Sequence, residues 1–175
     1  MTGTPLDIMT GIRGVQLLIK GYNGYSKGSR IENDKLVRNE IARATARVRS
    51  HMQTVFDTQF REGNLNLARP AKRCIEECNY LIEDVNKASS GMEHAFLSGQ
   101  RSPSNKDLKK LIKHDHEVIE MVTKAVNLAN SSEHSIATGE GDSKQLILET
   151  IQKITSCRGF FGVRMNILSG LKNKK

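Results

Sequence analysis

The segment His114-Asp115-His116-Glu117 brings together four side chains of the kinds that bind metal ions. Successive residues of an α-helix point about 100° apart, so these side chains cannot converge on one ion if the segment is helical. His116 and Glu120 lie one helical turn apart and provide two ligands at most. A di-iron bundle needs Glu-x-x-His on two helices, and the chain has no such motif. The sequence therefore predicts no metal site and no cofactor.

The cysteines give little sign of catalytic chemistry. Cys74 and Cys78 lie one helical turn apart within an apolar pattern, where cysteine is a common small core residue. A catalytic cysteine needs a neighbouring base and an electropositive setting. The chain also lacks a glycine-rich phosphate loop of standard spacing and His-Glu-x-x-His. We therefore expect a protein that is not an enzyme, and the odd number of cysteines favours reduced thiols and a cytoplasmic location.

Basic residues outnumber acidic residues in this chain, with 27 Lys and Arg and 19 Asp and Glu. The resulting formal charge of +8 favours anionic partners, and side chains that reach phosphates would bind nucleic acid in a salt-dependent way. Solvated helix faces also explain many of these charges, and aromatic residues for base stacking make up only 5% of the chain. The candidate contacts to an anion or nucleic acid are Arg43, Arg47, Lys109, Lys110, Lys113, Arg158, Arg164 and Lys172.

Long helices must carry these side chains, as the stretch from Ser29 to Glu62 illustrates. Ser29 and Glu32 have the spacing of a capping box, in which two side chains bind backbone N–H groups of the first turn. No proline or glycine interrupts the stretch until Gly63. Its stripe recurs every three or four positions, the period of one helix face, at Val37, Ile41, Ala44, Val48, His51 and Val55, and Met52 and Phe56 widen it.

The same period recurs along the chain and predicts five helices. We place them at about 5–20, 30–61, 68–97, 105–130 and 143–171, with a polar, glycine-rich loop over 131–142. Because short connections favour antiparallel neighbours, we expect one domain spanning residues 1–175, an all-α antiparallel up-down four-helix bundle of long helices with an additional short N-terminal helix. No apolar run approaches the ~20 residues of a transmembrane helix, and no signal peptide is evident.

Polar residues interrupt the apolar pattern at His51, Asp115 and Arg158. A buried Asp–Arg or Asp–His contact would set how the helices align, as polar residues do in the seams of coiled coils. For the short N-terminal helix we keep two interpretations. It is either a cap that closes one side of the bundle or a detachable amphipathic segment that binds a partner or a membrane surface.

The last predicted helix is apolar over a wider arc than one packing face requires. Its second apolar set, a candidate interaction surface, consists of Phe160, Val163, Ile167 and Leu171. Residues 143–175 also carry seven basic residues against one acidic residue. We therefore expect a non-enzymatic helical interaction or assembly module that binds another protein or a second copy of itself through this helix. The alternative is a small basic nucleic-acid-binding protein or ribonucleoprotein subunit. Gly159 and Gly162 leave the continuity of the helix open.

Overall fold

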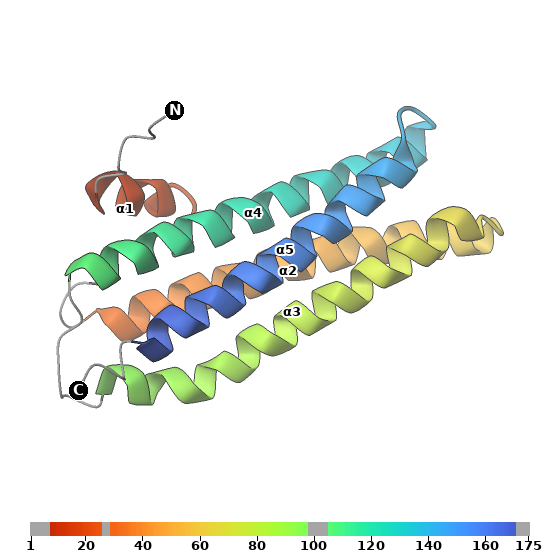
Figure 1. Ribbon diagram of the computed structural model, residues 1–175. Helices are drawn as coiled ribbons and strands as arrows, with labels where there is room; N and C mark the ends of the chain where they lie inside the picture. The colour runs from red at the N-terminus through yellow and green to blue at the C-terminus, as the bar shows by residue number, and fades with distance from the viewer. Residues whose placement is uncertain (1–7, 26–28, 98–104, 171–175) are drawn as a thin grey trace.

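The computed structural model describes the backbone of residues 8–25, 29–97 and 105–170, with side chains from 9, 12–25, 29–88 and 106–167. These residues form five helices and no strand (Figure 1). The helices are α1 (Ile8–Gln16), α2 (Arg30–Arg61), α3 (Leu65–Leu97), α4 (Asn105–Thr138) and α5 (Ser143–Gly170). The predicted all-α class is confirmed, and α5 is continuous through both of its internal glycines.

The four long helices form two antiparallel hairpins that lie side by side. Figure 1 shows that α2 and α3 run in opposite directions, as do α4 and α5. The hairpins meet with α2 against α4 and α3 against α5, and α1 packs on α4. A left-handed glycine conformation helps to turn each hairpin, with φ of +73° at Gly63 and +71° at Gly139. The predicted four-helix bundle with an additional N-terminal helix is therefore confirmed.

The helix boundaries differ from the prediction at three places. The stretch 131–138, predicted to be part of a loop, continues α4 as far as Thr138. Its serines fit the helix because Ser132 is buried and its hydroxyl donates to the carbonyl of Leu128 at 2.8 Å. The helix ends where the N–H of Gly139 binds the carbonyl of Ser135 at 3.0 Å. The second difference is that α3 begins at Leu65, slightly earlier than predicted, and the third is that α1 ends at Gln16 instead of at about residue 20.

The core is built from the aliphatic residues that the period singled out. Each long helix contributes a row of buried side chains, including Val37, Ile41 and Met52 from α2, Cys74, Cys78 and Leu81 from α3, Leu111, Ile119 and Val122 from α4, and Ile147, Ile154 and Cys157 from α5. The three cysteines are free and buried, which confirms the interpretation of Cys74 and Cys78 as core residues. Burial raises the pKa of the Cys157 thiol to about 12. Within the described ranges, no helix is long and apolar enough to cross a membrane.

Candidate functional site

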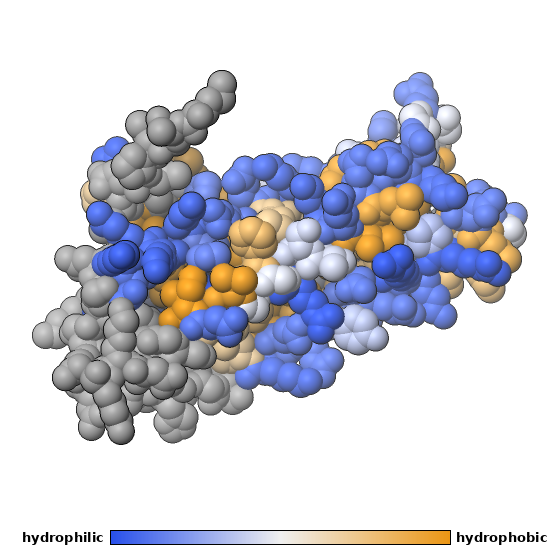
Figure 2. All heavy atoms as spheres, in the orientation of Figure 1, coloured by the Kyte–Doolittle hydropathy of each residue, from blue (hydrophilic) through white to orange (hydrophobic). Residues whose placement is uncertain are grey.

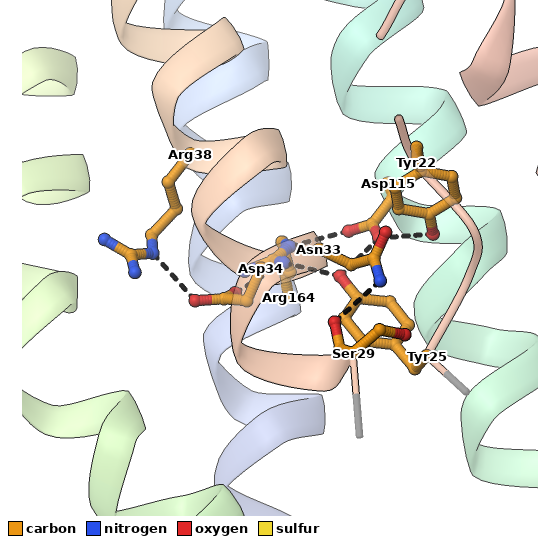
Figure 3. A network of polar contacts seen from close by, with 8 residues as sticks. All are labelled: Tyr22, Tyr25, Ser29, Asn33, Asp34, Arg38, Asp115 and Arg164. Atoms are coloured by element: carbon orange, nitrogen blue, oxygen red, sulfur yellow. Dashed lines mark hydrogen bonds and ion pairs between the residues drawn. The ribbon is translucent and has the colours of Figure 1, made fainter. Parts of the chain in front are cut away.

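Arg164 of α5 lies at the centre of a polar cluster inside the bundle (Figure 3). Its side chain is fully buried, with 0% exposure. Its Nε donates to Oδ1 of Asp115 on α4 at 2.7 Å, and its Nη2 donates to Oδ1 of Asp34 on α2 at 2.8 Å. One guanidinium therefore joins three helices through charge-assisted hydrogen bonds.

The segment that follows α1 adds two tyrosines to this cluster. The hydroxyls of Tyr22 and Tyr25 donate to Oδ2 of Asp115 at 2.9 and 2.5 Å. The Tyr25 hydroxyl also accepts a hydrogen bond from Nη2 of Arg164 at 2.8 Å. Figure 3 shows both rings pointing from this segment toward the carboxylate on α4. The cluster thereby fastens the N-terminal part of the chain to the bundle.

Asp34 extends the cluster toward the other side of α2. Its Oδ2 accepts a hydrogen bond from Nε of buried Arg38 at 2.8 Å, so this carboxylate lies between two guanidinium groups. The neighbouring Asn33 accepts from the backbone N–H of Asn23 at 2.8 Å. Two carboxylates and two guanidiniums therefore balance in formal charge within the buried cluster, as ion pairs in a low-dielectric interior require.

Burial and these neighbours shift the titration of the cluster. Burial raises the pKa of Asp115 above its ordinary value, although Arg164 and the tyrosine hydroxyls oppose the rise. Burial alone would lower the pKa of Arg164, but Tyr25, Asp115 and Asp34 together raise it well above its ordinary value. Burial, with a contribution from Asp115, also raises the pKa of Tyr22 and Tyr25 well above the usual tyrosine range. Both phenols therefore remain protonated hydrogen-bond donors at neutral pH.

The prediction of a buried Asp–Arg contact is confirmed for Asp115, but with a partner that the sequence analysis did not choose. Arg158 was placed in the seam of the last helix, whereas the buried positions run from Ile154 through Cys157 and Phe161 to Arg164. The cysteine was the available signal, because steps of three, four and three from Ile154 lead through Cys157 and Phe161 to Arg164. The assignment of Arg164 as a contact to nucleic acid is wrong, because its buried guanidinium is held by two carboxylates.

The seam residue His51 and the candidate Arg158 lie nearer the surface. The Nδ1 atom of His51 lies 2.6 Å from a carboxylate oxygen of Glu133, which links α2 to α4. Arg158 donates to Asp84 on α3 at 2.6 Å, and its guanidinium carbon lies 5.2 Å from the ring centroid of Tyr80. Both interactions join neighbouring helices at the edge of the core.

The remaining basic candidates lie on two helices. On α2, Arg43 contacts Glu40 at 2.7 Å and Arg47 approaches the same carboxylate at 3.7 Å. On α4, Lys109 and Lys110 are exposed, and Lys113 is exposed with a distant contact of 3.6 Å to Glu117. Lys172 lies outside the described residues. The structure thus brings together three lysines in the first turns of α4.

The second apolar set of α5 divides between the core and the surface. Phe160 is 36% exposed and Val163 is 45% exposed, whereas Ile167 is partly buried against the core. Leu171 lies outside the described residues. The ring of Phe160 packs against His114 of α4 with centroids 6.0 Å apart. Figure 2 shows hydrophobic atoms gathered over the C-terminal half of α5, with strongly hydrophilic atoms beside them over the start of α4.

The histidine-rich segment of α4 does not converge on a metal position. His114 faces α5 through its contact with Phe160, and His116 faces α1, where it approaches Gly14. Among the residues that the structure describes, no group of three or more His, Cys, Asp or Glu side chains is arranged to hold a metal ion.

A comparison of the chain with protein-family models, curated proteins and solved structures found no match. The class of the protein therefore follows from its fold alone, which is an all-α four-helix bundle with an N-terminal helix fastened to a buried charge cluster.

Proposed function

We propose that this protein is a non-enzymatic helical interaction module that binds a partner protein along the outer edge between α4 and α5. The exposure of Phe160 and Val163, at 36% and 45%, is the observation that carries the proposal. Burial of large apolar side chains is the main favourable contribution to most protein associations. Phe160 is also pre-positioned by its contact with His114, so it loses little conformational freedom when a partner covers it.

The charge around this apolar pair favours an acidic amphipathic helix as the partner. Lys109, Lys110 and Lys113 are exposed in the first turns of α4, the helix against which Phe160 packs. An apolar strip flanked by lysines complements a helix that carries one apolar face and glutamate or aspartate beside it. A second copy of the chain would bring its own formal charge of +8, which opposes self-association.

Site-specific photo-crosslinking in cells tests the docking edge. A photoreactive amino acid is placed at position 163 and, in a control protein, at position 148. Leu148 is a matched control because it lies on the same helix and is 42% exposed, close to the 45% of Val163, but it sits near the opposite end. We expect position 163 to crosslink to a helical segment with net negative charge and position 148 not to crosslink to it. Capture of a basic segment, or equal capture from both positions, would contradict the proposal.

Affinity for the captured segment provides the quantitative check. Phe160→Ala should weaken binding about tenfold or more, because an aromatic anchor typically contributes over 1 kcal/mol, whereas Leu148→Ala should leave affinity unchanged. Lys110→Glu should slow association and reduce its dependence on salt. If Phe160→Ala and Leu148→Ala bind equally well, the apolar pair is not the anchor.

Nucleic-acid binding remains the second candidate, supported by the same three lysines of α4. Each phosphate contact contributes about one unit to the slope of log affinity against log salt concentration. The solution mass and the ultraviolet absorbance ratio of the purified protein, recorded at low and high salt, separate the two functions. A complex that contains nucleic acid and dissociates steeply with salt would support this alternative over a protein partner.

A further inference from the structure

The N-terminal strap, defined as residues 8–25, is held on the bundle by a small set of polar contacts. Tyr22 and Tyr25 bind Asp115, and Tyr25 also binds Arg164. The backbone N–H of Asn23 donates to the side chain of Asn33 at the start of α2. These contacts join parts of the chain that are as much as 139 residues apart in sequence.

The apolar fit of the strap depends on close approach at two glycines. A Cβ atom on Gly14 would lie 2.6 Å from the His116 ring, so α1 reaches α4 only because this side chain is absent. Gly24 has φ of +67°, and a Cβ atom there would lie 2.8 Å from Ile12 within the strap itself. Val15 and Ile19 are buried. The strap thus packs in one specific position.

The strap also carries apolar side chains that face solvent. Met9 is 56% exposed and Leu18 is 40% exposed, and Leu17 just after α1 is 87% exposed. In Figure 1, α1 lies on the outside of α4, separate from the four long helices that enclose the main core. An isolated helix of nine residues is unstable in water, so α1 depends on its contact with α4.

Opening the strap and unfolding the bundle have different free-energy costs. The long helices bury their aliphatic rows mainly against one another, and the strap adds Val15, Ile19 and two tyrosines to one side of that core. Opening the strap loses the burial of Val15, Ile19 and both tyrosines, but it also lets water reach the charged pair of Arg164 and Asp115. Because desolvation of a buried ion is unfavourable, rehydration offsets part of the lost contact energy. Local opening of this kind is cheapest where few apolar groups separate.

We propose that the N-terminal strap is a conformational latch that opens as one unit while the four-helix bundle stays folded. Opening exposes the Arg164–Asp115 pair and the face of α4 around His116, and it frees an amphipathic segment. This latch is independent of the proposed docking edge, because α1 covers the His116 side of α4 whereas Phe160 packs on the His114 side.

Hydrogen exchange of the full-length protein, followed by mass spectrometry or NMR, tests the latch. We expect the amides of residues 12–25 to exchange together, faster than those in the middle of α2 and α5. Tyr25→Phe removes a hydroxyl that binds two charged side chains, so it should accelerate strap exchange about tenfold or more and leave the bundle unchanged. Tyr80→Phe is the matched control, since Tyr80 is a half-exposed tyrosine on α3, and should change neither rate.

Two further variants keep the test independent of the tyrosine. Gly24→Ala strains the backbone and meets Ile12, so it should accelerate strap exchange in the same way. Leu17→Ser changes an exposed strap residue and should have no effect. The latch is refuted if strap and bundle amides exchange at one common rate, if Tyr25→Phe accelerates all of them equally, or if the strap amides show no protection at all.

Discussion

Replacing Arg164 by methionine removes the buried guanidinium of α5 that forms ion pairs with Asp115 on α4 and Asp34 on α2. Asp34 keeps its ion pair with Arg38 at 2.8 Å, but Asp115 then retains only the two tyrosine hydroxyls as hydrogen-bond donors in the cluster. Leaving a buried charge without its counter-ion costs about 3–5 kcal/mol. Since domains of this size are stable by roughly 5–15 kcal/mol, Arg164→Met should remove a large fraction of the free energy of unfolding.

The double variant separates the ion pair from the packing around it. Asp115→Leu alone should also cost about 3–5 kcal/mol, because it leaves Arg164 with a single carboxylate partner. When Asp115→Leu and Arg164→Met are combined, both charges disappear, and the main remaining penalty is the lost acceptor of the two tyrosine hydroxyls, about 1–3 kcal/mol. The double variant should therefore be destabilised less than the sum of the two single effects, by at least about 3 kcal/mol.

Urea denaturation followed by circular dichroism measures the four free energies of this cycle. Arg158→Met is the control, because the Arg158–Asp84 pair has a similar separation of 2.6 Å but its side chains are 40% and 38% exposed. A surface pair of this kind contributes about 0–1 kcal/mol. If the effects of the two single substitutions at the buried pair simply add, or if Arg158→Met costs as much as Arg164→Met, the reasoning from burial is wrong.

Two other predictions concern the core and the strap. Leu81→Ala should lower the free energy of unfolding by about 2–5 kcal/mol in urea denaturation, whereas Leu148→Ala, at an exposed position, should leave it nearly unchanged. In a Tyr80→Phe background the remaining tyrosines are Tyr22 and Tyr25, whose raised pKa values mean that folding stabilises their protonated form. Their contribution to stability is complete below the ordinary tyrosine pKa of about 10 and is lost as the pH rises above it. The tyrosinate absorbance of Tyr22 and Tyr25 should therefore appear only together with loss of structure. A tyrosinate signal from a fully folded chain would contradict the burial of both phenols.

The approximate position of each helix in the sequence was predictable from local residue types. Apolar spacing led to helices close to those observed, and the seam positions Val37, Ile41 and Val48 are buried. Ser29 is the N-cap residue of α2, but it does not make the side-chain capping hydrogen bond that the capping box predicts. The C-terminal end of α4 was missed because Ser132 and Ser135 resemble loop residues in sequence. Their hydroxyls form hydrogen bonds with backbone carbonyls of Leu128 and Glu140, an arrangement that only the folded chain reveals.

The candidate sites were only partly predictable. Asp115 stood out because an acid interrupts an apolar seam, and the structure confirms that it is buried against an arginine. Arg164 was mistaken for a surface residue because the predicted seam was traced from Ile154 through Arg158, whereas the buried face runs through Cys157. Tyr22 and Tyr25 carried no signal, since they lie in a glycine-rich stretch that reads as a loop.

What the sequence determined by itself is therefore the set of helices, their apolar faces and the basic charge, because these depend on neighbours within one or two helical turns. The tertiary structure alone decided which charges meet. Arg164 is separated from Asp115 by 49 positions, and Tyr22 and Tyr25 by 93 and 90. Such contacts depend on the packing and alignment of whole helices. That alignment also leaves Phe160 at the surface and seals Arg164 beneath the N-terminal strap.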